Sequence, residues 1–241
     1  MIKMNDNHGI VLIHGAGLGN YVWSETNKHL DSPTLLIEFP NREMGGKVNE
    51  KLLFQDYLNS AIEQIENWGV SQFTIVAHSI GGSIGLKLND YFKERVNGFV
   101  GISAIIPKDG KSFADVFPIP QRLVLPLLLK FFGTRPPEKS IKDELCNDLE
   151  NSQSEEIVRR FSPESSKLYT TKINYEALPK MSMFIKLLND KSISQEIQNE
   201  MIGNLNCQEV VKLNCGHLPM KSKPKELAEI INNYIKKIQE R

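Results

Sequence analysis

The segment AHSIG, residues 77–81, places Ser79 between an apolar run and a helical pattern. A serine at such a junction is either a helix N-cap or a nucleophile held on a sharp turn between a strand and a helix. A sharp turn needs small residues two before and two after the serine, because strand and helix nearly touch there. Ala77 and Gly81 meet this condition, and Gly82 adds further room. The segment therefore favours a nucleophile.

A nucleophilic serine needs a base that accepts its proton, and His217 is the best placed of the five histidines. It follows the last expected strand in the segment LNCGHLPM, and functional groups of open α/β sheets collect on the loops after the strands. The other histidines occupy a polar terminus, the end of the first strand, a helix end and the serine's own turn: His8, His14, His29 and His78.

The base in turn needs an acid that fixes its tautomer and stabilises the imidazolium. Asp190 follows the fifth expected strand and precedes His217, which is the order that a serine turn of this kind uses. The same aspartate also suits an ordinary turn, because NDKS is good turn chemistry. Asp109, after the fourth expected strand, is the alternative acid.

An oxyanion that forms during attack needs two N–H donors, and the segment HGAGLGN follows the first expected strand. Its glycines leave the backbone open, so we expect the N–H groups of Ala16 and Ile80 to be the donors. A dinucleotide-binding loop is the competing interpretation. Its spacing would require glycine where Asn20 stands, although Glu38 does end the second expected strand as a ribose-binding acid would.

Short apolar runs that alternate with longer helical patterns must position these residues. The expected strands are 10–14, 34–38, 73–77, 98–102, 183–188 and 209–213, and the expected helices are 21–30, 50–68, 79–92, 193–202 and 224–239. This alternation predicts an α/β fold with a doubly wound, mostly parallel sheet of about six strands and no N-terminal hairpin.

The long segment between the fourth and fifth strands departs from this alternation. It is rich in helix formers, and a segment of that length is rarely a bare loop. We expect a core of residues 1–103 and 181–241, with a helical cap inserted over residues 104–180. The apolar cap residues either line a pocket or form the cap's own core: Phe113, Phe117, Leu123, Leu127 and Phe131.

Composition narrows the class of partner. Lys plus Arg and Asp plus Glu both number 29, and this balance argues against nucleic-acid binding. The three cysteines suggest reduced thiols, and the first residues lack the apolar core of a signal peptide, so we expect a cytoplasmic protein. The run LVLPLLLKFF is too short for stable membrane insertion. No metal or organic cofactor is expected, and a homodimer is left open.

In order along the chain, LIHGAG, AHSIGG, LNDKSIS and CGHLPM resemble the α/β-hydrolase fold, and most closely its plant methylesterase and hydroxynitrile lyase branch with its bacterial esterase relatives. This resemblance implies Ser79 as nucleophile, Asp190 as acid and His217 as base. It also implies a departure from the lyases, which carry a lysine where Leu218 stands and a threonine where Gly15 stands. Both differences favour ester hydrolysis over cyanohydrin cleavage.

The expected reaction is acyl transfer to water, with a small, mostly apolar ester, thioester or lactone as substrate and an acyl-enzyme on Ser79. Some relatives in this fold act instead as small-molecule receptors or partner-binding proteins with slow or vestigial catalysis. Fold alone does not separate the two, so a receptor is kept as the alternative and a hydroxynitrile lyase as a weaker one.

Overall fold

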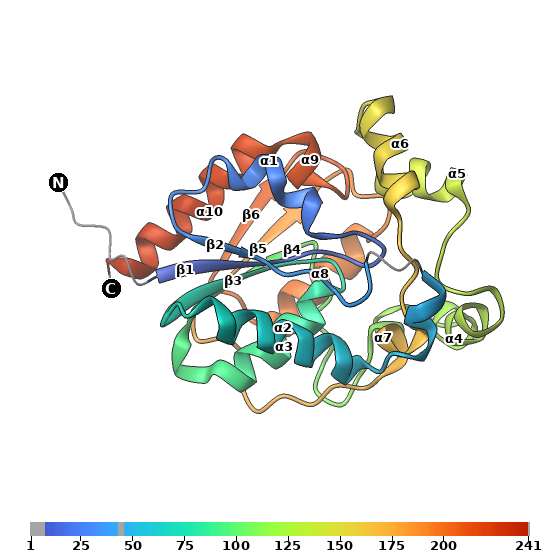
Figure 1. Ribbon diagram of the computed structural model, residues 1–241, viewed down its shortest axis with the longest axis horizontal. Helices are drawn as coiled ribbons and strands as arrows, with labels where there is room; N and C mark the ends of the chain where they lie inside the picture. The colour runs from blue at the N-terminus through green and yellow to red at the C-terminus, as the bar shows by residue number, and fades with distance from the viewer. Residues whose placement is uncertain (1–7, 43–45, 241) are drawn as a thin grey trace.

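The computed structural model describes residues 8–42 and 46–240 and is built on an open sheet of six parallel strands (Figure 1). The strand order is β2-β1-β3-β4-β5-β6. The strands are β1 (His8–Ile13), β2 (Thr34–Leu36), β3 (Gln72–His78), β4 (Val96–Ile102), β5 (Ser182–Leu187) and β6 (Glu209–Leu213). Each expected strand is present, and the doubly wound parallel sheet is confirmed.

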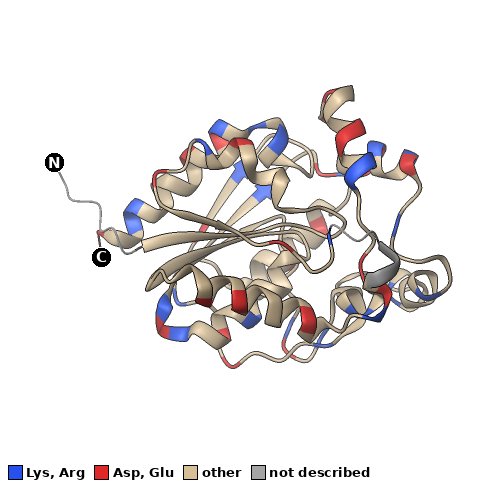
Figure 2. Ribbon diagram, in the orientation of Figure 1, with Lys and Arg blue, Asp and Glu red and all other residues tan. Residues whose placement is uncertain are grey.

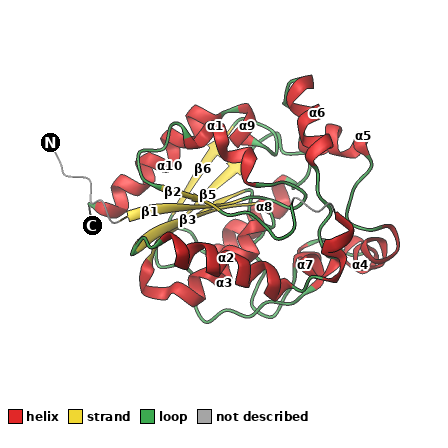
Figure 3. Ribbon diagram, viewed as in Figure 1, coloured by secondary structure: helices red, strands yellow, loops and turns green. Residues whose placement is uncertain are grey.

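Helices cover both faces of the sheet (Figure 3). One face carries α2 (Phe54–Trp68), α3 (Gly81–Phe92) and α8 (Gln195–Leu205), and the other carries α1 (Ser24–Asn27), α9 (Pro219–Ser222) and α10 (Pro224–Gln239). Side chains along a strand alternate between the two faces. In β3, Ile75 therefore packs in the core on the face of α2, α3 and α8, and Val76 packs in the core on the face of α9 and α10.

Two expected helices differ from the structure at their ends. The expected helix 21–30 is a 3₁₀ helix, η1 (Asn20–Trp23), followed by the single turn of α1. The expected helix 50–68 begins only at Phe54, after the 3₁₀ helix η2 (Gly46–Lys51), because the Asp56 carboxylate accepts the Leu53 N–H at 2.7 Å and starts α2 there. A third 3₁₀ turn, η3 (Lys93–Arg95), links α3 to β4.

His8 does not lie in a polar terminus, as the sequence had suggested. It is the first residue of β1 and is buried, with Nε2 3.2 Å from the Thr74 hydroxyl, and burial lowers its pKa. It is thus a core residue at the opposite end of β1 from Ser79. The first residues of the expected core, 1–7, lie outside the described residues, as does the expectation about a signal peptide there.

The chain between β4 and β5 folds into helices beyond the carboxyl ends of the strands (Figure 1). They are the 3₁₀ helix η4 (Phe113–Val116), α4 (Gln121–Phe132), α5 (Glu138–Ser140), the π-helical turn η5 (Ile141–Leu145), α6 (Asn151–Arg160) and α7 (Ser166–Thr170). In residues 8–42 and 46–240, no helix is long and apolar enough to cross a membrane. We call residues 104–180 the cap.

Candidate active site

Ser79 lies between β3 and α3 with a φ of 53°, in the left-handed region that side chains other than glycine rarely adopt. The turn is tight. A Cβ on Gly81 would lie 2.8 Å from the His14 carbonyl oxygen, and one on Gly82 would lie 2.6 Å from the Ile105 carbonyl oxygen. Small residues are therefore required where the sequence has them. The strain is held by the Ser79 N–H bond to the Ile102 carbonyl at 3.2 Å.

The structure brings Asp190 and His217 together. His217 Nδ1 lies 2.7 Å from Asp190 Oδ2, and both side chains are buried. The other carboxylate oxygen, Oδ1, accepts the N–H groups of Ser192 at 2.8 Å and Ile193 at 2.9 Å. Asp190 is therefore both a turn residue and the partner of His217. The sequence suggested these two roles as alternatives, and the structure shows both.

Ser103 is a further partner of Asp190 that sequence reasoning missed. Its hydroxyl donates to Asp190 Oδ2 at 2.7 Å, and it lies one residue after β4 with a φ of 40°. Because β4 and β5 are neighbours in the sheet, the residue after β4 is close to the loop after β5. A small hydroxyl residue directly after β4 is the feature of the sequence from which this contact could have been predicted.

The pKa of Asp190 reflects this environment. Burial by itself raises the pKa of the carboxyl, but the His217 charge and the hydrogen bonds from His217, Ile193 and Ser103 outweigh it and lower the pKa to about 2. Asp190 is therefore a carboxylate at neutral pH. It can hold the Nδ1–H tautomer of His217, which leaves Nε2 to accept a proton.

His78 supports His217 from the other side. Its Nε2 lies 2.9 Å from the His217 carbonyl oxygen, and the two ring centroids are 4.6 Å apart. Burial, and then the charge of His217, hold the pKa of His78 well below its ordinary value, so this ring is neutral. A neutral ring donates one N–H, and His78 uses it to fix the backbone of the loop that carries His217.

The loop after β1 is fixed by His14. His14 Nδ1 donates to the Gly15 carbonyl at 2.8 Å, because a carbonyl oxygen can only accept, and Nε2 lies 3.4 Å from the Phe39 nitrogen and 3.3 Å from Glu38 Oε1. That carbonyl shares a planar trans peptide with the Ala16 N–H, so the two point in opposite directions. The direction of the Ala16 N–H is thereby set. Among described residues, no hydrogen bond uses the N–H of Ala16 or Ile80.

The cap holds the same loop one residue further on. The Gly17 N–H donates to Glu164 Oε1 at 3.0 Å, and the Gly17 carbonyl accepts the Ser162 N–H at 2.9 Å. Glu164 is buried and pairs with Arg42. Gly17 has a φ of 75°, and a Cβ there would overlap the Phe161 ring. Only glycine suits this contact.

The contacts of Glu38 argue against a dinucleotide-binding loop, as the spacing of the glycines already does. Its carboxylate oxygens lie 3.2 and 3.3 Å from the Asn20 N–H, and Arg42 Nε lies 3.6 Å from Oε1. Glu38 therefore ties the glycine-rich loop to the chain after β2. Its carboxylate is occupied where a ribose-binding acid would face a ligand.

The cap also anchors the loops of the acid and the base. The Gly216 N–H donates to Asp148 Oδ2 at 2.6 Å, and the Asn147 amide donates to the Asn189 carbonyl at 3.0 Å. Asn147 thus binds the residue directly before Asp190, and Asp148 binds the residue directly before His217. Asp109, the alternative acid, is exposed and accepts the Tyr175 N–H at 3.0 Å.

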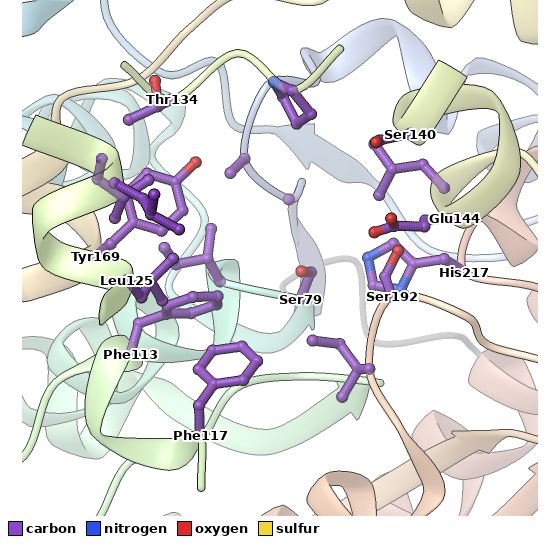
Figure 4. A pocket seen from close by; sticks show the side chains of 18 of the residues that line it. Ser79, Phe113, Phe117, Leu125, Thr134, Ser140, Glu144, Tyr169, Ser192 and His217 are labelled. Carbon is purple, nitrogen blue, oxygen red and sulfur yellow. The ribbon is translucent and has the colours of Figure 1, made fainter. Parts of the chain in front are cut away.

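A pocket of about 660 Å³ joins these elements, and Ser79 and His217 both face it (Figure 4). Ala16 and Ile80 line it as well. The rest of its wall is mostly apolar and comes from the cap, with Glu144 as a charged residue at its edge. In the described part of the chain, no group of three His, Cys, Asp or Glu side chains is arranged to hold a metal.

Two of the five apolar cap residues have one of the roles left open by the sequence, and the other three have neither. Phe113 and Phe117 line the pocket, whereas Leu123, Leu127 and Phe131 are exposed. They lie on the outer side of α4, whose inner side meets the pocket through Gln121 and four apolar residues: Val124, Leu125, Leu128 and Leu129. The sequence predicted a helical cap, but neither the bounds of α4 nor the side of it that faces the pocket.

Known proteins resemble the chain over nearly its whole length. Methylesterase 9 of Arabidopsis thaliana is 24% identical over 242 residues, with 91% of this chain and 94% of that protein aligned. An extracellular α/β-hydrolase from a Paenibacillus species has a TM-score of 0.83 at 22% identity and covers 94% of this chain and 98% of its own. A pyrethroid hydrolase from Sphingobium faniae has a TM-score of 0.79 at 19% identity, covering 97% and 99%.

Structural similarity at such low identity establishes the fold alone. The family assignment comes from a sequence model of the alpha/beta hydrolase family, which matches residues 10–230 and so includes Ser79, Asp190 and His217. The methylesterase and esterase relatives support an ester hydrolase within that family. The chain therefore belongs to the alpha/beta hydrolase family, in the branch that resembles plant methylesterases.

Proposed function

We propose that the protein hydrolyses a small, mostly apolar carboxylic ester, thioester or lactone through an acyl-enzyme on Ser79. One observation carries this proposal. Ser79, on its strained turn, shares a pocket with His217, and the Nδ1 of His217 is bonded to the ionised Asp190. This is the order of nucleophile, base and orienting acid that acyl transfer requires.

In the proposed reaction, His217 Nε2 takes the Ser79 proton while Oγ attacks the carbonyl carbon. The oxyanion is stabilised by the N–H groups of Ala16 and Ile80, which line the pocket. His217 then gives its proton to the leaving alcohol. Water, deprotonated by the same ring, releases the acid and restores Ser79.

The pocket supports the substrate class. Its volume of about 660 Å³ is in the usual range for sites that bind small organic molecules. Its wall is mainly apolar, which favours a neutral acyl group over a charged one. The similarity to proteins named methylesterases favours a small leaving alcohol. We therefore propose an ester whose bulk lies on the acyl side.

The test is hydrolysis of a series of esters by Ser79→Ala and by a matched control. Ser83→Ala is the control, because Ser83 lies in α3 directly after the Ser79 turn, is buried and donates to the Ile105 carbonyl at 3.3 Å. Ser79→Ala should lower kcat by roughly 10⁴- to 10⁶-fold and abolish fluorophosphonate labelling. Ser83→Ala should keep both. A folded Ser79→Ala protein with undiminished turnover would refute the proposal.

A hydroxynitrile lyase fits the site less well. A Cβ on Gly15 would lie 2.9 Å from His78 Nδ1 and 3.1 Å from the Ser79 Cβ, so this backbone leaves no space for a threonine. Leu218 is fully buried, which does not suit a cyanide-binding cation at that position. Cyanohydrin cleavage above the rate without enzyme would reverse this ranking.

A small-molecule receptor with slow catalysis is the second candidate. The Paenibacillus hydrolase shares structural and functional homology with tobacco salicylic acid binding protein 2, which gives this alternative its support. A receptor would show a covalent burst on Ser79 without sustained turnover, whereas the proposed esterase would turn over many times. A cytoplasmic location stays part of the proposal and rests on the three cysteines, which the structure leaves as free thiols.

A further inference from the structure

Helix α4 carries most of the apolar surface that the protein exposes. Seven of the eleven large apolar side chains exposed among the described residues lie in or just before this helix: Ile119, Leu123, Val124, Leu127, Leu128, Phe131 and Phe132. Phe131 and Phe132 are the most exposed, at 71% and 81%. A surface concentration of this kind marks a site of interaction rather than chance exposure.

The helix is also held loosely. None of its twelve residues is buried, whereas α2 and α3 each bury five or more. It contacts α7 and η4, at the end of the molecule away from the sheet (Figure 1). A helix with few buried side chains belongs to the less stable part of a fold and can move without disturbing the core.

The exposed surface and the pocket are continuous. Leu123, Leu127 and Phe131 recur every four residues and form an outward row. Val124 and Leu128 lie beside this row and are exposed, yet they also line the pocket. An apolar chain could therefore pass from the outer surface of α4 to Ser79 without crossing a polar rim.

The charge of this surface is positive. Residues 118–137 contain Arg122, Lys130 and Arg135 and no acidic residue, and α4 is largely free of charge in Figure 2. Among described residues, no ion pair uses Arg122 or Lys130. Of the elements that pack most closely on α4, α7 adds Lys167, and the one acid of η4, Asp115, is bonded to Ser112. Glu196 and Glu200 of α8 line a groove with Arg122 at the start of α4, at the end away from Phe131 and Phe132.

We propose that α4 docks the protein onto a phospholipid surface with anionic headgroups. Exposed Phe and Leu side chains with flanking basic residues are the features of a helix that lies in a lipid interface without spanning it. A second copy of the chain is a poorer occupant. In a two-fold interface each α4 would face itself, so its basic residues would meet those of the other copy, and residues 118–137 supply no acid to pair with them.

Docking in this way would present the pocket entrance to esters dissolved in the lipid. That consequence rests on the proposed function, but lipid binding itself does not. The Ser79→Ala protein should bind vesicles like the wild type while losing turnover. Loss of hydrolysis and loss of docking are therefore separate results.

The experiment is flotation of the full chain with vesicles of phosphatidylcholine, with and without phosphatidylglycerol. The wild type should bind the anionic vesicles. Phe131→Gln with Phe132→Gln should weaken that binding by at least about tenfold, because two apolar rings no longer partition. Lys130→Gln should weaken it by roughly fivefold, and only on anionic vesicles. The double variant should keep its rate on a short, water-soluble ester.

Tyr91→Gln is the matched control, since Tyr91 is also exposed, at 59%, but lies near the end of α3, at the opposite end of the sheet from α4 (Figure 1). It should bind vesicles like the wild type. Failure of the wild type to float with anionic vesicles would overturn the proposal, as would equal losses in the Tyr91 and Phe variants. A concentration-dependent dimer that the Phe variants abolish, with no vesicle binding, would assign the surface to a second copy.

Discussion

Replacing Asp190 with asparagine tests the site most directly, because the two residues have the same shape and differ in charge. The Asp190 carboxyl has its pKa lowered to about 2 from an ordinary value of 3.8. At about 1.4 kcal/mol per unit, the site favours the charged carboxylate by between about 2 and 3 kcal/mol, or roughly 50-fold. That preference is lost in Asp190→Asn.

The effect on turnover should exceed this electrostatic part. The asparagine carbonyl would accept the N–H groups of Ser192 and Ile193, as Oδ1 does now. Its NH₂ group would then face His217 Nδ1 and favour the wrong tautomer, with the proton on Nε2. We expect kcat to fall by at least about 50-fold, and toward 10⁴-fold where the tautomer effect is complete. KM should change little.

Stability gives an independent measure. A carboxyl whose pKa is lowered on folding stabilises the protein above its unfolded pKa, near 3.8, and this contribution disappears as the pH falls toward 2. Asp190→Asn should therefore lower Tm by roughly 4–8 °C at pH 7, and the gap from the wild type should close between pH 4 and about 2.

The assay is ester hydrolysis under saturating substrate, with thermal unfolding followed by circular dichroism across that pH range. Asp109→Asn is the control, because Asp109 is exposed and binds only the Tyr175 N–H. It should keep nearly the full rate. If folded Asp190→Asn stays within a few-fold of the wild-type rate, or if the two variants lose the same amount, Asp190 does not orient the base.

Three further outcomes follow from the geometry. Ser79→Gly should abolish hydrolysis yet raise the free energy of unfolding by about 1 kcal/mol, since glycine adopts a φ of 53° without strain. The control Ser83→Gly should lower the free energy of unfolding in the same thermal assay, because Ser83 lies inside a helix. Ser103→Ala should reduce kcat roughly three- to tenfold at unchanged KM, because Asp190 keeps its other bonds; no change would show that the hydroxyl does not position the acid. Glu164→Gln should cost up to about 3 kcal/mol in denaturant unfolding, because buried Arg42 is left with Glu38, 3.6 Å away, as its acid partner; an unchanged midpoint would contradict that.

The strands and the positions of Ser79, Asp190 and His217 at one site could be predicted because each rests on local information. Buried parallel strands appear as continuous apolar runs, and Ser79 is marked by the small residues that its tight turn needs. The turn chemistry around Asp190 and the position of His217 after the last strand are also local. Their meeting follows from strand order alone.

The supporting contacts could not be predicted, because they join residues far apart in the chain. Glu164 and Gly17 are a case in point, since nothing near either residue indicates the other. The same holds for His78 and the carbonyl of His217. The side of α4 that meets the pocket was also hidden, because apolar residues surround the helix and leave no polar face to orient it.

The bonds from the cap to the loops of the core also limit how such proteins can be recombined. Glu164 binds Gly17, and Asp148 binds Gly216, so the cap supports the loop after β1 and the loop that carries His217. A chimera that takes the cap of a relative would leave these N–H groups without acceptors. New specificities should therefore arise more readily by changing α4, which lacks such bonds, than by exchanging the cap as a unit.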